Sequence, residues 1–183
     1  MKLQSIAAAA LLLAAGSSHA SLVTNGGFES GLTGWSCVAV GGGCFTGTQS
    51  GIAAVEGSSY FFGFDNTPPP GLLSQDLATV AGASYSISLS FNTNGGAPPN
   101  ALELEVGDLT ETMALAEDTW RSFTGLFTAS GASTSLGLFF TTVGGSGTVF
   151  VDKIVVERVP VPATLALAAL GLAGLAASRR KQH

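Results

Sequence analysis

The sequence predicts an all-β fold in which two antiparallel sheets pack face to face. Several short stretches alternate apolar and polar side chains, which is the period of a half-buried strand. Glycine- and proline-rich turns separate these stretches, as in Asn94-Gly95-Gly96 and Pro98-Pro99-Asn100. No window between the two chain ends keeps the 3.6-residue period of an amphipathic helix. Many short strands with such turns indicate a jelly-roll sandwich.

The first twenty residues are typical of a secretory signal peptide. Lys2 supplies the positive start, residues 6–15 the apolar centre, and Ser18-His19-Ala20 a cleavage site of small residues. We therefore expect an exported protein whose mature chain begins at Ser21. The expected organisation is a signal peptide at 1–20, one folded domain at 21–158 and a sorting tail at 159–183.

Four stretches carry the strongest strand pattern. Between Ser84 and Phe91, apolar side chains alternate strictly with serines. Between residues 101 and 106, Glu103 and Glu105 alternate with apolar residues, so we expect both carboxylates on the solvent face. The other two strong stretches are residues 135–140 and 150–156. Weaker candidates are residues 51–55, 60–64, 71–77, 109–115 and 123–129.

Residues 21–158 are acidic and contain no histidine. All twelve Asp and Glu residues lie there, against Arg121, Lys153 and Arg158, so the formal charge of this segment is −9. We expect no nucleic-acid partner, because basic surfaces bind phosphate backbones. The lack of histidine excludes a Ser-His-Asp triad, a Cys-His dyad and most zinc sites, so we expect no catalytic residues of these kinds.

Cys37 and Cys44 are the two cysteines of the chain. In the oxidising environment outside the cytoplasm they predict a disulfide that closes a short, glycine-rich loop. A metal site is the alternative interpretation. Two thiolates without a nearby histidine fall short of the four ligands that a structural zinc ion needs.

The tail has three parts. Pro160-Val161-Pro162 comes first, an apolar run of residues 163–177 follows, and Arg179-Arg180-Lys181 lies near the end. The run predicts a transmembrane helix of about 22 Å, shorter than the roughly 30 Å of bilayer hydrocarbon. We expect its cations on the cytoplasmic side. A buried helix of a soluble domain is the alternative, which the all-round apolar run disfavours.

This tail resembles the PEP-CTERM sorting signal. From Val159 the chain reads V-P-V-P-A-T-L-A-L-A-A-L-G-L-A-G-L-A-A-S-R-R, the family's order of proline motif, short apolar helix and basic end. Val161 stands where the family has Glu. The resemblance implies that an exosortase recognises the chain in the membrane and directs it to the cell surface or an exopolysaccharide matrix. A plain membrane anchor, with the domain facing the periplasm or cell exterior, is the alternative.

The domain resembles galactose-binding-like jelly rolls of carbohydrate-binding modules. The resemblance rests on Asn25-Gly26-Gly27-Phe28-Glu29 and Gly34-Trp35 near the start and on Phe150-Val151-Asp152-Lys153-Ile154 at the end. It implies a structural calcium ion as the one candidate cofactor, with Glu29 and Asp152 as ligands and Gly27 as a carbonyl donor. Ordinary hydrogen bonds of Glu29 and Asp152 at the strand ends are the alternative. Lys153 stands where the family has a second Asp.

Together these features predict a non-catalytic protein of the surface or matrix that binds carbohydrate. A small secreted glycosidase is the alternative, because paired carboxylates suffice for that chemistry and Glu103 and Glu105 are the nearest pair. A sugar-stacking platform needs exposed aromatic rings, and we expect Trp35 in the core. The candidate rings are Trp35, Tyr60, Phe61, Phe62, Phe64 and Trp120.

Overall fold

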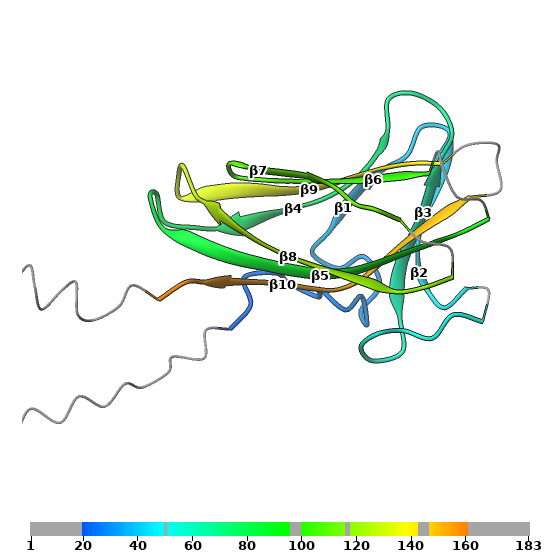
Figure 1. Ribbon diagram of the computed structural model, residues 1–183, viewed down its shortest axis with the longest axis horizontal. Helices are drawn as coiled ribbons and strands as arrows, with labels where there is room; N and C mark the ends of the chain where they lie inside the picture. Colours follow the sequence, from blue (N-terminus) through cyan, green and yellow to red (C-terminus); the bar gives the residue numbers. More distant parts are fainter. Residues whose placement is uncertain (1–19, 50, 96–99, 116–117, 143–146, 161–183) are drawn as a thin grey trace, which may run out of the picture.

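The computed structural model describes residues 20–49, 51–95, 100–115, 118–142 and 147–160. Across these residues the chain forms ten β-strands and no α-helix. The strands make two five-stranded sheets, which lie face to face as the layers of a sandwich (Figure 1). Neighbouring strands are antiparallel throughout both sheets. The predicted all-β, two-sheet fold is confirmed.

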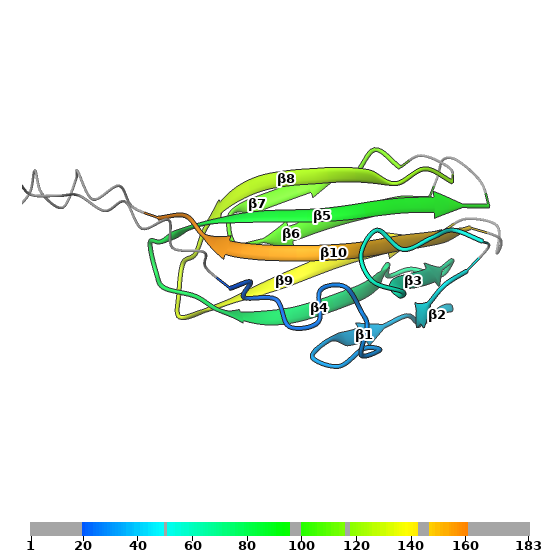
Figure 2. The same ribbon diagram turned by 90° about the horizontal axis from the view of Figure 1, so that it is seen from below.

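Sheet A has the strand order β1-β4-β9-β6-β7, and sheet B has the order β2-β3-β10-β5-β8. Figure 2 shows β10 running beside β5 through the middle of sheet B. The strands of sheet A are β1 (Ser36–Val38), β4 (Gly71–Ala78), β6 (Ala101–Val106), β7 (Leu109–Thr112) and β9 (Ser133–Thr141). The strands of sheet B are β2 (Gly42–Gly47), β3 (Tyr60–Asp65), β5 (Ser84–Asn94), β8 (Arg121–Thr128) and β10 (Thr148–Arg158).

Eight of these strands coincide with predicted stretches, and the prediction was wrong at three places. The stretch at 109–115 forms a strand only to Thr112, because Met113 turns into the core, where it is buried. The short strands β1 and β2 were not predicted, since they lie within a glycine-rich segment that was interpreted as a loop. The third error concerns residues 51–55.

Residues 51–55 form a loop beside sheet B rather than a strand. Ile52 and Ala54 are half-buried while Ala53 and Val55 are exposed, so the loop has the alternation of a strand. Its backbone N–H and carbonyl groups form hydrogen bonds with side chains of other elements instead of with a neighbouring strand. The indole N–H of Trp120 donates to the Ala53 carbonyl at 2.9 Å, and the Val55 N–H donates to Asp152 at 2.7 Å. The period-two pattern here therefore reflects packing on a sheet and not membership of one.

The hydrophobic core lies between the two sheets and is built by the inward half of each alternating strand. From sheet A the fully buried side chains include Leu73, Leu104, Leu136, Leu138 and Phe140. From sheet B they include Ile87, Leu89, Phe61, Val149, Val151 and Val156. Burial of this many large apolar side chains is the main stabilising contribution of the fold. The alternate side chains of each strand point outward, away from this core.

The predicted disulfide is confirmed. It joins Cys37 of β1 to Cys44 of β2, with their Cα atoms 6.3 Å apart. Because β1 is an edge strand of sheet A and β2 an edge strand of sheet B, the bond connects the two sheets. The pair therefore closes one open edge of the sandwich.

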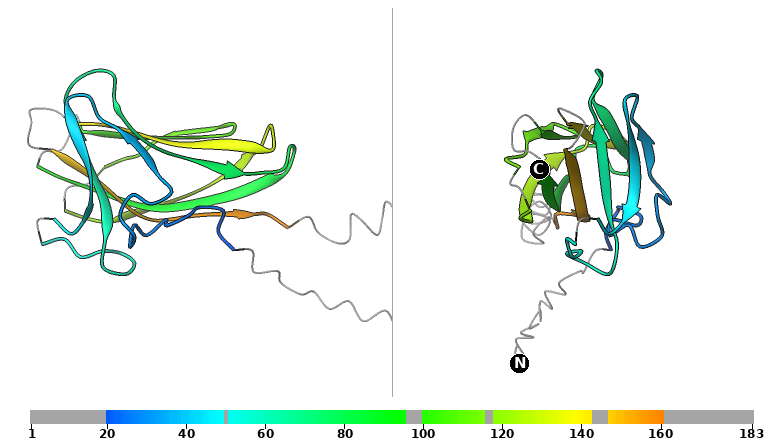
Figure 3. Two further views of the ribbon diagram at one scale, coloured as in Figure 1. Left: turned by 180° about the vertical axis from the view of Figure 1, so that it is seen from behind. Right: turned by 90° about the vertical axis from the view of Figure 1, so that its right-hand side faces the viewer.

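The segment before β1 packs along the sandwich and joins it to the last strand. The Leu22 N–H donates to the Val156 carbonyl at 2.8 Å, and the Ile154 N–H donates to the Gly26 carbonyl at 3.0 Å. Trp35 is buried against Phe28, as predicted, with ring centroids 5.4 Å apart. Seen from behind, the N-terminal segment begins beside the end of β10 (Figure 3). The two ends of the domain thus lie next to each other.

Within the described ranges, no helix has the length and apolar character needed to cross a membrane. The predicted signal peptide, apart from Ala20, and the predicted helix at 163–177 fall outside those ranges. The same holds for Val161, Pro162 and the basic end, whereas Pro160 is the last described residue.

We expect the Cys37→Ala/Cys44→Ala double variant to melt roughly 5 °C below the parent protein. A short closed loop gives about 2 kcal/mol of chain-entropy stabilisation, and a domain of this size loses about 2–4 °C per kcal/mol. The measurement is thermal unfolding by circular dichroism. Reducing the parent should lower its melting temperature equally, while reducing the double variant should change nothing. Equal melting temperatures for all four samples would contradict a stabilising cross-link between the sheets.

Candidate functional site

The outer face of sheet A carries an apolar row of side chains. The strand register aligns Val38 of β1 with Leu72 of β4 and Leu72 with Phe139 of β9. Phe139 is in turn paired with Glu103 of β6, so the apolar row ends at a carboxylate. These residues alternate with inward-facing neighbours and therefore point away from the core.

A polar row lies beside the apolar one, two residues along each strand. Ser36 pairs with Ser74, and Ser74 pairs with Gly137 in the middle of the sheet. Gly137 also pairs with Glu105, which continues to Thr110 of β7. One surface thus offers a strip of apolar side chains next to a strip of hydroxyl and carboxylate groups.

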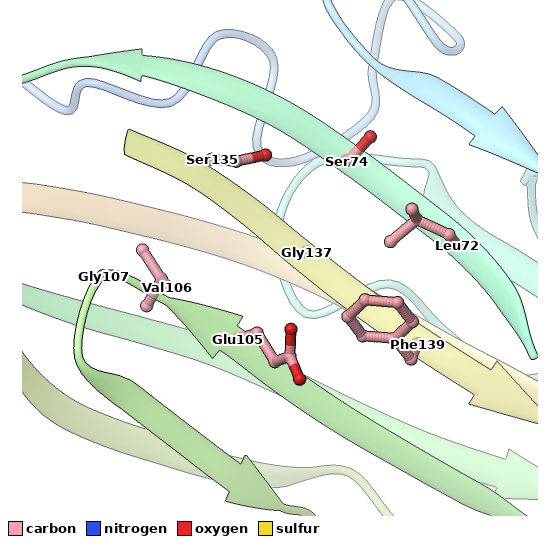
Figure 4. Close-up of a pocket in the computed structure, with 8 residues that line it drawn as sticks. All are labelled: Leu72, Ser74, Glu105, Val106, Gly107, Ser135, Gly137 and Phe139. Carbon is pink, nitrogen blue, oxygen red and sulfur yellow. The ribbon is translucent and has the colours of Figure 1, made fainter. Parts of the chain in front are cut away.

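A hollow of about 230 Å³ is centred on these rows (Figure 4). In the figure the Glu105 carboxylate reaches towards the Phe139 ring, and Leu72 lies on the other side of that ring. Ser74 and Ser135 line the opposite part. The complete lining consists of Leu72, Ser74, Glu105, Val106, Gly107, Ser135, Gly137 and Phe139.

The hollow is open above Gly137 because this residue has no side chain. A Cβ atom at this position would lie 3.2 Å from Cε2 of Phe139 and 3.5 Å from Cδ1 of Leu72. The Phe139 ring therefore leans across the space above Gly137. Phe139 is half-buried and Glu105 is exposed, so both contribute accessible surface to the hollow. An aromatic ring beside convergent polar groups is the usual composition of a small-ligand site.

Glu103 and Glu105 share the outer face of β6, as predicted, while Leu102, Leu104 and Val106 between and beside them are buried. Residues two apart on a strand are separated by about 6.6 Å along it. Both carboxylates therefore approach the hollow from the same side. In a glycosidase, by contrast, the two catalytic carboxylates lie on opposite sides of the glycosidic bond.

The rings proposed as stacking candidates from the sequence do not lie in this hollow. Trp35 and Phe61 are buried in the core, and Tyr60 is buried on the outer side of sheet B, where burial raises the pKa of its hydroxyl. Phe62 and Phe64 are half-buried there and stack on the exposed Phe45 ring, at centroid distances of 5.3 and 6.0 Å.

Phe139 was missed as a site residue, although its signal is present in the sequence. The alternation that predicted Leu136, Leu138 and Phe140 as inward residues also places Gly137 and Phe139 outward. An aromatic residue at an outward strand position, two residues after a glycine, could have been singled out. What the sequence does not contain is the register that brings Leu72, Ser74 and Glu105 alongside.

Glu29 and Asp152, the predicted calcium ligands, both bind backbone of the loop between β2 and β3. Glu29 is exposed and accepts hydrogen bonds from the N–H groups of Ser58 and Ser59, at 2.8 and 2.7 Å, and from the Ser58 hydroxyl at 2.8 Å. The Ser58 backbone N–H is the largest cause that lowers the pKa of Glu29. A side chain on Gly27 would approach Asp152, whose Oδ1 lies 3.9 Å from that Cβ position.

Asp152 is fully buried on β10. Its Oδ2 accepts the N–H groups of Val55 and Glu56, at 2.7 and 3.0 Å, and its Oδ1 accepts the Lys153 N–H at 2.7 Å. Burial raises the pKa of this carboxyl, and the three donors oppose the rise. Because the pKa of Asp152 is raised on folding, the folded protein holds this proton more tightly than the unfolded chain does. The free energy of unfolding therefore falls as the pH rises through the folded-state pKa.

These contacts satisfy both carboxylates without a metal ion. In the part of the chain that the structure describes, no three His, Cys, Asp or Glu side chains form a cluster that could hold one. Backbone carbonyls and the remaining lone pairs of Asp152 are still of the oxygen chemistry that calcium uses. The calcium ion therefore stays a prediction.

A second hollow, of about 180 Å³, lies on the outer face of sheet B. Serine and threonine side chains of β5 and β8 dominate its lining, with Lys153 as the charged group. Among the rings, only Phe123 contributes, and this residue also packs against the hydrophobic core. The hollow on sheet A, which has an outward aromatic ring, is therefore the better candidate.

Known proteins resemble this chain in two separate parts, the C-terminal tail and the folded domain. Residues 158–181 match the PEP-CTERM protein-sorting motif. No curated protein matches the chain. Many solved structures share the fold of the domain.

Three solved structures illustrate the fold. The carbohydrate-binding module TmCBM61, solved with β-1,4-galactotriose, aligns at 14% identity and a TM-score of 0.60, covering 76% of this chain and 99% of its own. The CBM22-1 xylan-binding domain of Xyn10C from Paenibacillus barcinonensis aligns at 18% identity and 0.59, covering 78% and 97%. The enzymatically active domain of bacteriophage CBA120 tailspike protein 4 aligns at 10% identity and 0.60, covering 76% of this chain but only 21% of the tailspike chain.

At these identities the structural similarity establishes the fold and not the ligand. The motif indicates an exported protein that is either anchored in the membrane or released at the surface. The chain therefore carries a PEP-CTERM sorting motif at residues 158–181, and its folded domain shares the jelly-roll fold of carbohydrate-binding modules.

Proposed function

We propose that this protein is a non-catalytic glycan-binding protein of the cell surface or exopolysaccharide matrix. The hollow on the outer face of sheet A is the observation that carries the proposal. A pyranose ring has an apolar C–H face and a polar rim. The ring of Phe139 offers a surface for the first, and Ser74, Ser135 and Glu105 offer hydrogen-bond partners for the second.

The fold and the neighbours support the same interpretation. The xylan-binding domain and the galactotriose complex align over nearly their whole length with this domain. A rigid sheet also suits the task, since a preformed platform loses little conformational entropy on binding.

The glycosidase alternative draws support from Glu103 and Glu105, which adjoin the hollow, and from the enzymatically active tailspike domain. One feature disfavours it. Both carboxylates project from one strand, so they do not face each other across the hollow. Release of reducing sugar from a bound glycan, lost in Glu105→Gln, would favour the enzyme instead.

We propose that the tail holds this domain at the membrane until an exosortase acts on it. Residue 158 ends β10 and begins the matched motif, so no long linker separates the domain from the tail. The domain would therefore stay close to the membrane surface before processing. Val161 in the proline motif lacks the carboxylate that the family has there, which we expect to slow recognition.

Glycan binding should depend on Phe139. We expect Phe139→Ala to weaken the affinity for β-1,4-linked galactan, xylan or glucan oligosaccharides by about fivefold, because loss of an aromatic contact costs on the order of 1 kcal/mol. The measurement is isothermal titration calorimetry on the full chain in a detergent without a sugar headgroup. Phe45→Ala is the matched control, since Phe45 is 46% exposed on the opposite sheet. Equal losses for both variants, or no binding by the parent, would contradict the proposed site.

The proposed calcium ion can be tested through stability. If Glu29 and Asp152 share an ion, EDTA should lower the melting temperature and added Ca²⁺ should restore it. Asp152→Asn should abolish that response. Asp65→Asn is the control, because Asp65 is equally buried and also accepts backbone N–H groups, from Val40 and Gly41. A parent protein whose melting temperature ignores EDTA has no such ion.

The tail proposal predicts an effect of Val161→Glu. In a host with an exosortase, this substitution should move protein from the membrane fraction to the surface or medium, because it restores the family's residue. In a host without the enzyme, both versions should stay in the membrane. Fractionation and immunoblotting give the result. Identical distributions in both hosts would leave the plain membrane anchor as the explanation.

A further inference from the structure

The charges of the domain are divided unequally between its two sheets. The five strands of sheet A contain four carboxylates and no Lys or Arg. Arg121, Lys153 and Arg158, the cations of the described ranges, all belong to β8 and β10 of sheet B. The carboxylates of sheet A are Asp76, Glu103, Glu105 and Glu111.

Three of these carboxylates border the hollow. Glu105 lines it, and Glu103 is paired with Phe139 at the end of the apolar row. On the other side, Asp76 of β4 is exposed and is paired with Ser135, which also lines the hollow. A ligand seated on Phe139 therefore has negative charge on two sides.

Within the described part of the chain, the Glu105 carboxylate makes no hydrogen bond or ion pair with another side chain, and it reaches towards Phe139 (Figure 4). A glycan over that ring would remove part of the water around this carboxylate. Displacing that water is unfavourable unless the ligand supplies a strong donor in its place. A protonated amine offsets this cost more fully than a neutral hydroxyl, because hydrogen bonds between opposite charges are stronger.

We propose that the preferred ligand of this face is a glycan that carries free amino groups, such as a β-1,4-linked glucosamine polymer. The inference rests on the proposed function, because it names the ligand class of the same hollow. It also excludes polyuronates, whose carboxylates would be repelled by Glu103, Glu105 and Asp76. The hollow and its ring define where the sugar lies, and the carboxylates define which charge it carries.

The test compares four hexasaccharides that share a β-1,4-linked backbone: glucose, N-acetylglucosamine, glucosamine and mannuronic acid. Affinities are measured by titration calorimetry with the full chain, in a detergent without a sugar headgroup. We expect the glucosamine hexamer to bind about tenfold more tightly than the glucose hexamer at low salt. The difference should shrink at high salt, because exposed charges are screened. N-acetylation removes the charge and should abolish the advantage.

Two variants separate a local contact from general attraction. Glu105→Gln should weaken glucosamine binding about threefold to fivefold, as expected for an exposed charge pair. It should weaken glucose binding less, because the substituted side chain still offers hydrogen bonds and loses only the charge. Glu157→Gln makes the same change in net charge on the outer face of sheet B, where Glu157 pairs with Ser86, and should affect neither ligand.

Each result is decisive. Equal affinities for the glucose and glucosamine hexamers, or tightest binding of the mannuronic acid hexamer, would overturn the inference and leave the proposed glycan site intact. Equal effects of Glu105→Gln and Glu157→Gln would also overturn it, because the attraction would then be non-local. Binding of none of the four hexamers would overturn the inference and count against the proposed function as well.

Discussion

The buried contact between the two sheets determines what the rest of the structure can do. Inward side chains such as Leu138 of sheet A and Ile87 of sheet B occupy the core and fix each strand's register. Because side chains alternate, every inward residue commits its neighbours to the outside. Burial of Leu138 thus forces Gly137 and Phe139 onto the outer face, where they form the hollow. A one-residue shift of β9 would bury the site and expose the core.

The alternating pattern made much of this fold predictable. Ser84–Asn94 and Ala101–Val106 show strict period-two sequences, and both are strands. Residues 51–55 show a similar pattern and are a loop, because packing against a sheet also buries every second residue. The site was less predictable, since it depends on which strands become neighbours. Phe139 and Leu72 are far apart in sequence and meet only through the β4–β9 pairing.

The edges of the sandwich and its chain ends suit an exported protein. The Cys37–Cys44 bond joins the two edge strands on one side, where a short β1 offers few other contacts. At one end of the domain, the Leu22 N–H binds the Val156 carbonyl, so the start of the folded domain lies beside the strand that leads into the sorting motif. The outer face of sheet A contains none of these connections, which leaves it accessible to the glycan that we propose it binds.

The central claim is that a glycan lies on the outer face of sheet A. Backbone amide NMR shifts of the full chain in detergent micelles, titrated with the β-1,4-linked glucose and glucosamine hexamers, test it most directly. We predict the largest changes at residues 72–76, 103–105 and 135–139, with little change around Phe45 and Phe62. Changes confined to sheet B, or an absence of changes with both hexamers, would contradict the account.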